Sequence, residues 1–146
     1  MTSENRVNII ARDGRCKAIV KRSTFWSSIG HVTTREAANT FVRARRTELP
    51  KATHHAFAWR VGDPVSWEES SDDGEPTGTA GLPVMNVLRN ANLTDVAIVV
   101  SRIFGGTKLG FGGLARAYGR CAADLVMKAG IIDARDHEQR TRKETR

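Results

Sequence analysis

The sequence predicts one α+β domain, a two-layer α/β sandwich in which helices cover one face of a mixed sheet. Segments with strand patterning come first in the chain, and strand and helix patterns then follow one another as far as residue 130. This order is typical of an α+β fold. A chain of 146 residues normally forms one domain and buries enough surface to fold without disulfides.

The first 32 residues are expected to contribute two or three strands. Residues 15–20 and 24–32 have strand patterning and are joined by a short polar turn. A further strand near residues 6–11 is expected, because Asp13 followed by Gly14 is a strong hairpin signal. We therefore treat residues 1–14 as an N-terminal arm or edge strand that precedes the main domain at residues 15–130.

Three helices are expected after these strands. Thr33 and Glu36 form a capping box that starts the first helix, and Pro50 ends it. Apolar residues recur at helical spacing in two later segments, and Gly130 has the position of a C-cap glycine. The later helices are expected at residues 80–91 and 114–129.

Two more strands and two irregular segments complete the pattern. Residues 53–61 alternate as a strand does, so His54 and His55 are expected on opposite faces, with His54 toward the loops. The continuous apolar run at residues 96–100 is typical of a central strand. Residues 63–78 are expected to form a long loop, and the charged residues 131–146 a disordered tail.

Charge and cysteine content narrow the class of protein. The net charge of +7 favours a polyanionic partner such as RNA, although a solvated cationic surface explains it equally well. Six acids and no Lys or Arg lie between Gly62 and Gly81. Cys16 and Cys121 do not form a disulfide framework, and no apolar run resembles a signal peptide or a membrane span. We expect a reduced, cytoplasmic protein.

The most informative part of the chain is the glycine-rich stretch, residues 101–118, SRIFGGTKLGFGGLARAY. It combines five glycines with three cationic side chains. The glycines are Gly105, Gly106, Gly110, Gly112 and Gly113, and the cations are Arg102, Lys108 and Arg116. The stretch is not a P-loop, because Lys and Ser/Thr do not follow at the required spacing. We expect an anion cradle in which backbone N–H groups face a phosphate. A crossover that lets helix and sheet pack closely is the alternative.

The acidic motif, residues 71–76 (SDDGEP), holds Asp72, Asp73 and Glu75 around a turn glycine. Crowded carboxylates raise one another's pKa unless a cation or donor lies near, so a positive group is expected beside them. They would either bind a divalent cation such as Mg²⁺, or pair with Arg102 and Arg116 and cap the helix that follows. The sequence leaves both open.

Three segments resemble the conserved domain of the YigZ/IMPACT family. They are KATHHAFAWRVG, SDDGEPTGTAGLPVMNVL and VAIVVSRIFGGTKLGFGGLARAY, and KRSTF at residues 21–25 fits the family's opening strand. The resemblance spans roughly residues 17–129 and implies a fold similar to the second domain of a small-subunit ribosomal protein. Eukaryotic relatives regulate translation by binding a regulator of an initiation-factor kinase. Bacterial members usually carry a second, ferredoxin-like domain, which we expect to be absent here.

These observations predict a binding module linked to translation that contacts RNA, the ribosome or a translation regulator. The expected site lies where the acidic motif meets the glycine-rich stretch, with Arg102, Lys108 and Arg116 supplying charge and His54 as a further ligand-binding candidate. No catalytic residue is identified. One alternative is a Mg²⁺-dependent enzyme acting on a phosphorylated small molecule or nucleotide. Another is a protein-interaction module whose basic first helix meets an acidic partner. The sequence does not give the oligomeric state.

Overall fold

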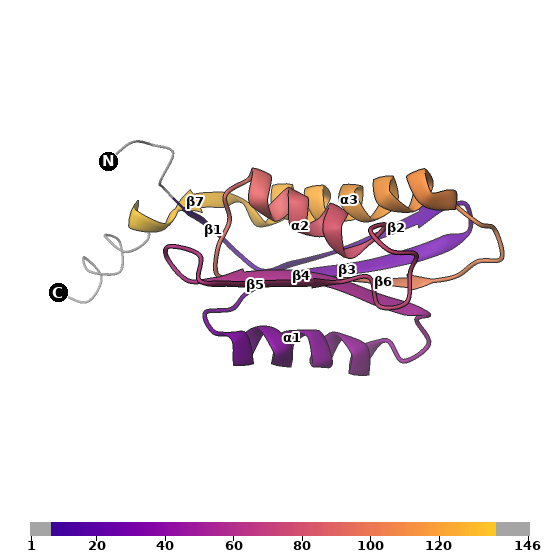
Figure 1. Cartoon of the computed structure of the whole chain (residues 1–146), viewed down its shortest axis with the longest axis horizontal. Coiled ribbons are helices and arrows are strands. Elements are labelled where there is room, and N and C mark those ends of the chain that lie inside the picture. Colours follow the sequence, from indigo (N-terminus) through magenta and orange to yellow (C-terminus); the bar gives the residue numbers. More distant parts are fainter. Residues whose placement is uncertain (1–6, 137–146) are drawn as a thin grey trace.

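The computed structural model describes residues 7–136, which form a five-stranded antiparallel sheet with helices on both faces (Figure 1). Helix α1 (Arg35–Glu48) lies on one face, and α2 (Gly81–Asn90) and α3 (Gly110–Ala129) lie on the other. The α+β class is confirmed. The expectation that helices cover one face of a mixed sheet is wrong, because α1 buries an apolar stripe of its own against the opposite face and every strand pair is antiparallel.

The sheet has the strand order β2-β3-β6-β4-β5. The bounds are β2 Gly14–Val20, β3 Ser23–His31, β4 His54–Val61, β5 Trp67–Ser71 and β6 Val96–Ile103. Strand β6 is central and buried on both faces, as its apolar run predicts. It brings the start of the glycine-rich stretch to the middle of one end of the sheet.

Strand β5 corrects the prediction of an uninterrupted loop at residues 63–78. It pairs with β4 at the edge of the sheet, and four of its five residues are exposed. An edge strand that buries so little has no alternation of apolar and polar residues to reveal it. Backbone pairing with β4 holds it in place.

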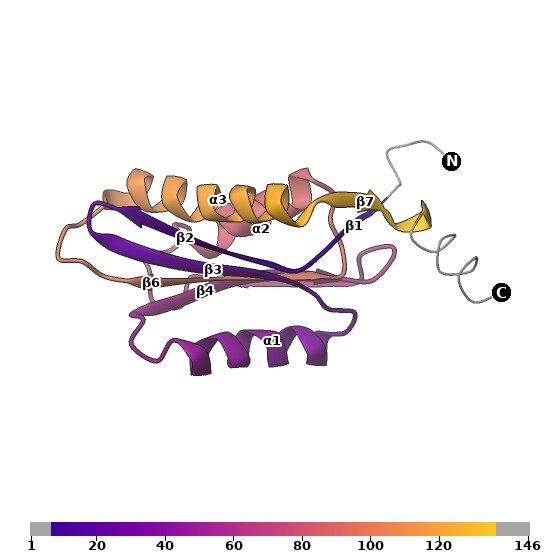
Figure 2. The same cartoon turned by 180° about the vertical axis from the view of Figure 1, so that it is seen from behind.

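The first and last strands correct two further predictions. β1 (Asn8–Ile10) pairs with β7 (Ile131–Asp133), so Asp13 and Gly14 do not turn a hairpin between β1 and β2. Ile9 and Ile10 are buried, which fixes this small sheet against the domain (Figure 2). The expected tail at residues 131–146 therefore begins with a strand. Residues 137–146 and residues 1–6 of the expected arm lie outside the described residues.

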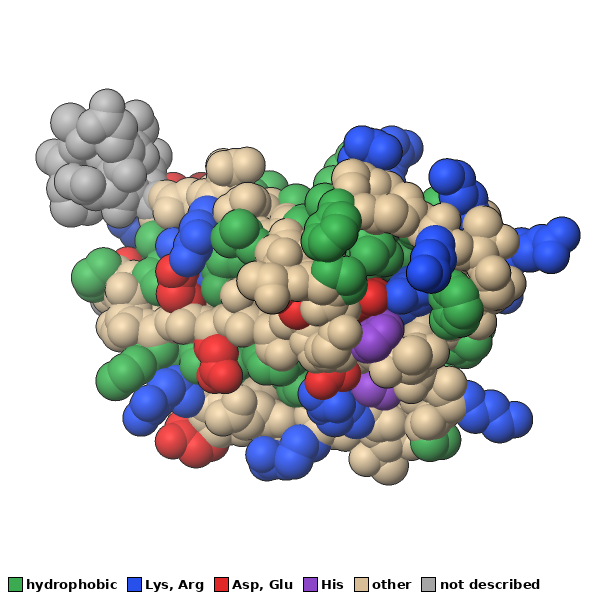
Figure 3. Space-filling view, turned by 45° about the vertical axis from the view of Figure 1, so that its right-hand side comes forward, with side chains coloured by type: hydrophobic (Ala, Val, Ile, Leu, Met, Phe, Trp, Pro, Cys, Tyr) green, Lys and Arg blue, Asp and Glu red, His purple; other side chains and the backbone are tan. Residues whose placement is uncertain are grey.

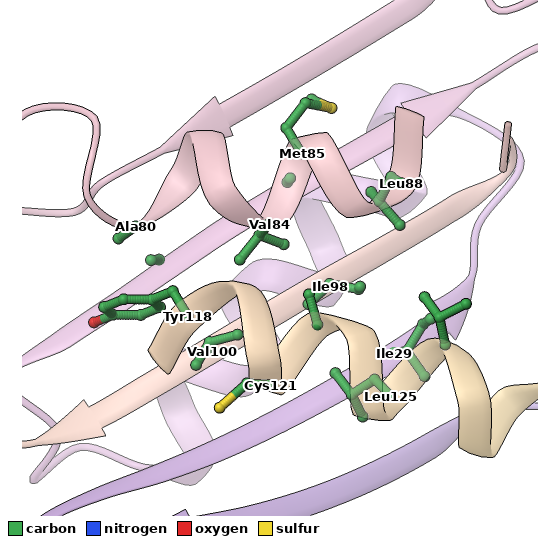
Figure 4. Close-up of a cluster of buried hydrophobic side chains, with 14 of the residues drawn as sticks. Ile29, Ala80, Val84, Met85, Leu88, Ile98, Val100, Tyr118, Cys121 and Leu125 are labelled. Atoms are coloured by element: carbon green, nitrogen blue, oxygen red, sulfur yellow. The ribbon is translucent and has the colours of Figure 1, made fainter. Parts of the chain in front are cut away.

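Two hydrophobic cores lie on the two faces of the sheet. The larger fills the space between the sheet and α2 and α3, where Leu88, Ile98 and Leu125 meet (Figure 4). The smaller lies under α1 and contains Trp59 and Val99. Alternate residues of β6 enter each core, which explains its continuous apolar run. Within residues 7–136, no helix has the length and apolar character needed to cross a membrane.

Candidate functional site

A hollow of about 480 Å³ lies at the end of the sheet where α3 begins. It is bordered by the acidic motif on one side and the glycine-rich stretch on the other. Its principal residues are His54, Glu75, Pro76, Arg102, Phe104, Lys108, Gly110 and Phe111. Figure 3 shows this side of the molecule, where histidine is visible between acidic and basic side chains with hydrophobic side chains nearby. The two motifs singled out in the sequence thus meet at one site.

A buried ion pair forms the floor of the hollow. Arg102 donates through Nε and Nη2 to the two carboxylate oxygens of Glu75, at 2.6 and 2.7 Å, and their side chains are 8% and 1% exposed. Arg102 also donates to the Ser23 hydroxyl at 3.2 Å. The Tyr118 hydroxyl donates to Glu75. Every strong polar group in this network has a partner, so the network is a support for the site and not an open ligand set.

The ionisation of the network follows from these contacts. Burial opposes the charged form of Glu75, but hydrogen bonds from Arg102 and Tyr118 outweigh it and lower the pKa of the carboxyl. Burial, and then the bond to Glu75, raise the pKa of the Tyr118 phenol. Glu75 is therefore an anion and Tyr118 a neutral donor at neutral pH.

The turn in the acidic motif directs its three carboxylates to different places. Asp73 and Gly74 have φ values of 46° and 88°, and this left-handed pair turns Glu75 inward. Asp72 instead accepts hydrogen bonds from the backbone N–H groups of Gly78 and Gly81, both at 2.9 Å, and so caps α2. Burial opposes its ionisation, and these bonds outweigh burial and lower its pKa.

Asp73 connects the acidic motif to α1 and β4. Its carboxylate accepts from Arg46 on α1 at 2.8 Å and from the His55 backbone N–H at 2.7 Å. The prediction that the acidic motif pairs with Arg116 is wrong, because its acids are bound by Arg46, Arg102 and backbone donors. Within residues 7–136 there is no group of three or more His, Cys, Asp or Glu side chains placed to hold a metal ion. The divergent carboxylates do not fit a shared Mg²⁺ site.

The two histidines lie on opposite faces of β4, as their adjacency predicts. His54 faces the hollow, where Nδ1 donates to the Asp73 carbonyl at 2.7 Å and Nε2 lies 3.4 Å from Glu75. His55 is buried on the α1 face, with Nδ1 2.7 Å from the Ser101 hydroxyl. Burial and the charge of Arg46 lower the pKa of His55.

The glycines have different structural tasks. A Cβ at Gly105 would lie 2.0 Å from the carbonyl oxygen of Arg22, so this position permits close approach of the β2–β3 turn. Gly106 and Gly110 have φ values of 89° and 77°. Gly112 and Gly113 lie in the first turn of α3, which begins with neither a side-chain cap nor an acidic residue. The first N–H groups of a helix have no partners within the helix, and this turn lies beside the hollow, which Gly110 and Phe111 line.

The structure does not bring all the predicted site residues together. Arg102, Lys108, Gly110, His54 and Glu75 line the hollow. Arg116 lines a separate hollow on α3 with Val20, Lys21 and Val87. Asp72, Asp73, Gly105, Gly106, Gly112 and Gly113 are not among the residues that line the site hollow.

Two exposed phenylalanines were missed by the sequence reasoning. Phe104 and Phe111, which are 46% and 69% exposed, both line the hollow with Lys108 between them in the chain. Lys108 forms no ion pair with any residue in the described range 7–136. The available signal was that neither phenylalanine belongs to the apolar stripe of a helix or the buried face of a strand, although each is large and hydrophobic.

Comparisons with known proteins agree with this fold. The family model of the Impact N-terminal domain matches residues 21–126. YvyE of Bacillus subtilis, an IMPACT family member, is 36% identical over 82% of this chain and 55% of its own length. YigZ of Escherichia coli, another member, is 43% identical over 68% of this chain and 50% of its own length. The chain spans about half the length of these curated relatives.

Two solved structures are similar in three dimensions. A crystal structure of a hypothetical protein has a TM-score of 0.82 and 36% identity, covering 87% of this chain and 63% of that one. The structure of the two-domain translational regulator Yih1 has a TM-score of 0.50 and 25% identity, covering 89% of this chain and 49% of that one.

Proposed function

Because this chain belongs to the Impact N-terminal domain family, we propose that it is an RNA-binding module that takes part in translation regulation. Single-stranded RNA would lie across the hollow, on the glycine-rich stretch. The similarity to a two-domain translational regulator supports the link to translation. The observation that carries the RNA proposal is the pair of exposed phenylalanines, Phe104 and Phe111, with Lys108 between them in the chain and without an ion-pair partner among residues 7–136.

This combination has the chemistry that single-stranded RNA needs. Exposed aromatic rings stack on unpaired bases, and cations follow the phosphate backbone. Lys108 supplies a charge that no described residue neutralises. The uncapped N-terminal turn of α3 adds backbone N–H groups beside the same surface, where a phosphate is favoured. The Arg102–Glu75 pair holds β6 and the acidic motif in place beneath.

The test is binding of fluorescein-labelled oligouridine, followed by fluorescence anisotropy at several salt concentrations. The Phe111→Ala variant should bind about tenfold more weakly, since a base stacked on an aromatic ring contributes roughly 1–3 kcal/mol. Met127→Ala is the matched control, because Met127 is also an exposed hydrophobic residue of α3 (83%) and does not line the hollow. Equal losses in both variants would contradict the proposed surface.

Lys108→Ala tests the phosphate contact in the same assay. The slope of log K against log salt concentration should become shallower by about 0.7, the value for one phosphate contact to a single strand. Arg120→Ala is the control, because Arg120 is highly exposed and pairs with Asp124 on the far part of α3. Absence of wild-type binding at low salt would reject the RNA proposal.

A further inference from the structure

Strand β2 is an open edge of the main sheet. It has β3 as a neighbour on one side and no strand on the other within residues 7–136. An open edge leaves alternate backbone N–H and C=O groups without ladder partners, and such groups can pair with an added strand. The geometry of the β2–β3 turn decides which residues of β2 present these groups.

The turn between β2 and β3 has two residues, Lys21 and Arg22, with φ values of 47° and 71°. Two left-handed residues are the mark of a type I′ hairpin, in which the flanking pair is hydrogen bonded. Alternation then directs the backbone groups of Cys16 toward β3. The Ser27 hydroxyl of β3 donates to the Cys16 carbonyl at 3.4 Å, which agrees with this orientation.

The same alternation directs the backbone groups of Arg15, Lys17 and Ile19 outward. Lys128 on α3 donates to the Arg15 carbonyl at 2.6 Å and so closes that end of the edge. Beyond it, no hydrogen bond to the outward groups of Lys17 or Ile19 is formed by the described part of the chain. The open edge is therefore centred on Lys17 and Ile19.

The side chains beside this edge form a partly apolar surface that α1 does not cover. Helix α1 packs mainly on β4 and β6 and covers β3 only at its end, where Phe41 lies against Gly30, so the same face of the sheet is left exposed around Trp26 and Ile19. Ile19 is 67% exposed, and the Lys17 ammonium lies 4.8 Å from the centre of the exposed Trp26 ring. A hollow of about 400 Å³ lies between Lys17, Trp26 and the end of α1 at Glu48.

The charge at the edge indicates what would occupy it. Arg15, Lys17, Lys21, Arg22 and Lys128 all lie on or beside the edge and its turn. The nearby acids are engaged, because Glu48 is held by Arg15 and Arg45, and Asp13 accepts from the His31 backbone N–H. A second copy pairing antiparallel through β2 would place these cations against one another, which is unfavourable. An acidic strand meets no such repulsion.

We propose that the open edge of β2 binds an extended acidic segment of a partner protein, which adds a strand to the sheet. Alternate apolar side chains of the segment pack on Ile19 and Trp26, on the face that also carries Lys17. Its acidic side chains lie on the other face, where they meet Lys128 of α3 and the cations of the turn, Lys21 and Arg22. The surface involves none of the residues of the RNA proposal, so either proposal stands or fails without the other.

The test uses a fluorescein-labelled peptide of sequence Glu-Val-Glu-Phe-Glu-Val, with binding followed by fluorescence anisotropy. Methylation of alternate backbone nitrogens removes ladder donors and keeps the charge, and should weaken binding at least about tenfold because several hydrogen bonds are lost. Replacement of the glutamates by lysines should abolish binding. Equal binding of the methylated peptide would overturn strand addition, and no binding of the parent peptide would overturn the proposal.

Two protein variants locate the peptide. Ile19→Pro removes an outward N–H at an edge position where proline is tolerated, and should weaken binding about tenfold more than Ile19→Ala does. Lys17→Glu should weaken it about tenfold through like-charge repulsion, and it keeps the test valid if the proline variant does not fold. Displacement of the peptide by oligouridine, or a dimer in sedimentation that the peptide does not dissociate, would overturn the assignment of this edge to an acidic partner.

Discussion

The acidic motif and the glycine-rich stretch face the same hollow, but their charges are satisfied in different ways. The three carboxylates of the acidic motif are each bound inside the protein, by Arg102, by Arg46 or by the N-terminus of α2. Lys108 in the glycine-rich stretch has no such partner among the described residues. The difference supports a division of roles, in which the acidic motif holds the site together and Lys108 with the exposed rings would contact the proposed partner. Substitutions should therefore affect stability on one side and binding on the other.

The largest effect is expected from breaking the buried pair. Glu75→Gln leaves the Arg102 guanidinium buried without a counterion and should lower the free energy of unfolding by about 3–5 kcal/mol. Urea denaturation measures this value. Glu69→Gln on β5 is the control, because Glu69 is exposed and its removal should change stability by less than about 0.5 kcal/mol. If Glu75→Gln lowered the free energy of unfolding no more than the control does, the acidic motif would not support the site.

The next largest effect is expected at Gly105, where the lack of a side chain lets the glycine-rich stretch pack against the β2–β3 turn. Gly105→Ala would place a methyl group against the Arg22 backbone and should cost about 1–3 kcal/mol. Gly14→Ala is the matched control, because its new Cβ would meet neighbours at 3.7 Å or more. Thermal or urea unfolding compares the two. If the two variants were equally stable, the β2–β3 turn could move to make room for the added methyl group, and close packing at Gly105 would not be required.

A smaller effect is expected from the cap of α2, and it depends on pH. Asp72→Ala removes the cap and should lower the free energy of unfolding by about 1 kcal/mol at neutral pH. The folded-state pKa of Asp72 lies below its ordinary value, so the contribution of its charge is present above about pH 3.9 and is lost as the pH falls through the folded-state pKa. Urea denaturation across this range should show the variant and the wild type converging in acid. A constant difference would mean that the charge of Asp72 contributes nothing.

The smallest effect on stability is expected at the exposed rings. Phe104→Ala should change the free energy of unfolding by less than about 1 kcal/mol, because nearly half of the side chain is already in water, yet it should weaken oligouridine binding. Urea denaturation measures the effect on stability, and fluorescence anisotropy on the same sample measures the effect on oligouridine binding. A large loss of stability would place Phe104 with the acidic motif as a structural residue.

Much of the fold could be predicted because its signals are local. The start of α1 after residue 33, the apolar run of β6 and the position of Gly130 as the C-cap of α3 appear in the structure as expected. The capping box at Thr33 and Glu36 is wrong by one residue, because Thr34 is the N-cap and its hydroxyl accepts from the Ala37 backbone N–H. The edge strand β5 and the β1–β7 pair could not be predicted, since backbone pairing with a distant segment defines them and few side chains are buried. The face of the sheet that α1 covers was also missed. An amphipathic stripe shows that a helix packs against the sheet, but it does not show which face of the sheet the helix covers.

The site was predictable only in outline. The two motifs are recognisable by composition, and the structure places Glu75 beside Arg102. The partners of the other acids depend on the left-handed turn at Asp73 and Gly74, which sends neighbouring carboxylates in opposite directions. Arg46 comes from a helix on the other face of the sheet and no spacing rule connects it to Asp73.

The position of Tyr118 gives the protein a built-in optical probe. It is the one tyrosine of the chain, and its ring is fully buried and packs in a T-shaped arrangement with Phe25. Because its phenol cannot release a proton while it remains enclosed beside the Glu75 anion, the ultraviolet band of tyrosinate should emerge during alkaline titration only as molecules unfold. A rapid jump to high pH, followed by absorbance, would then record the rate at which this end of the protein opens, without any added label.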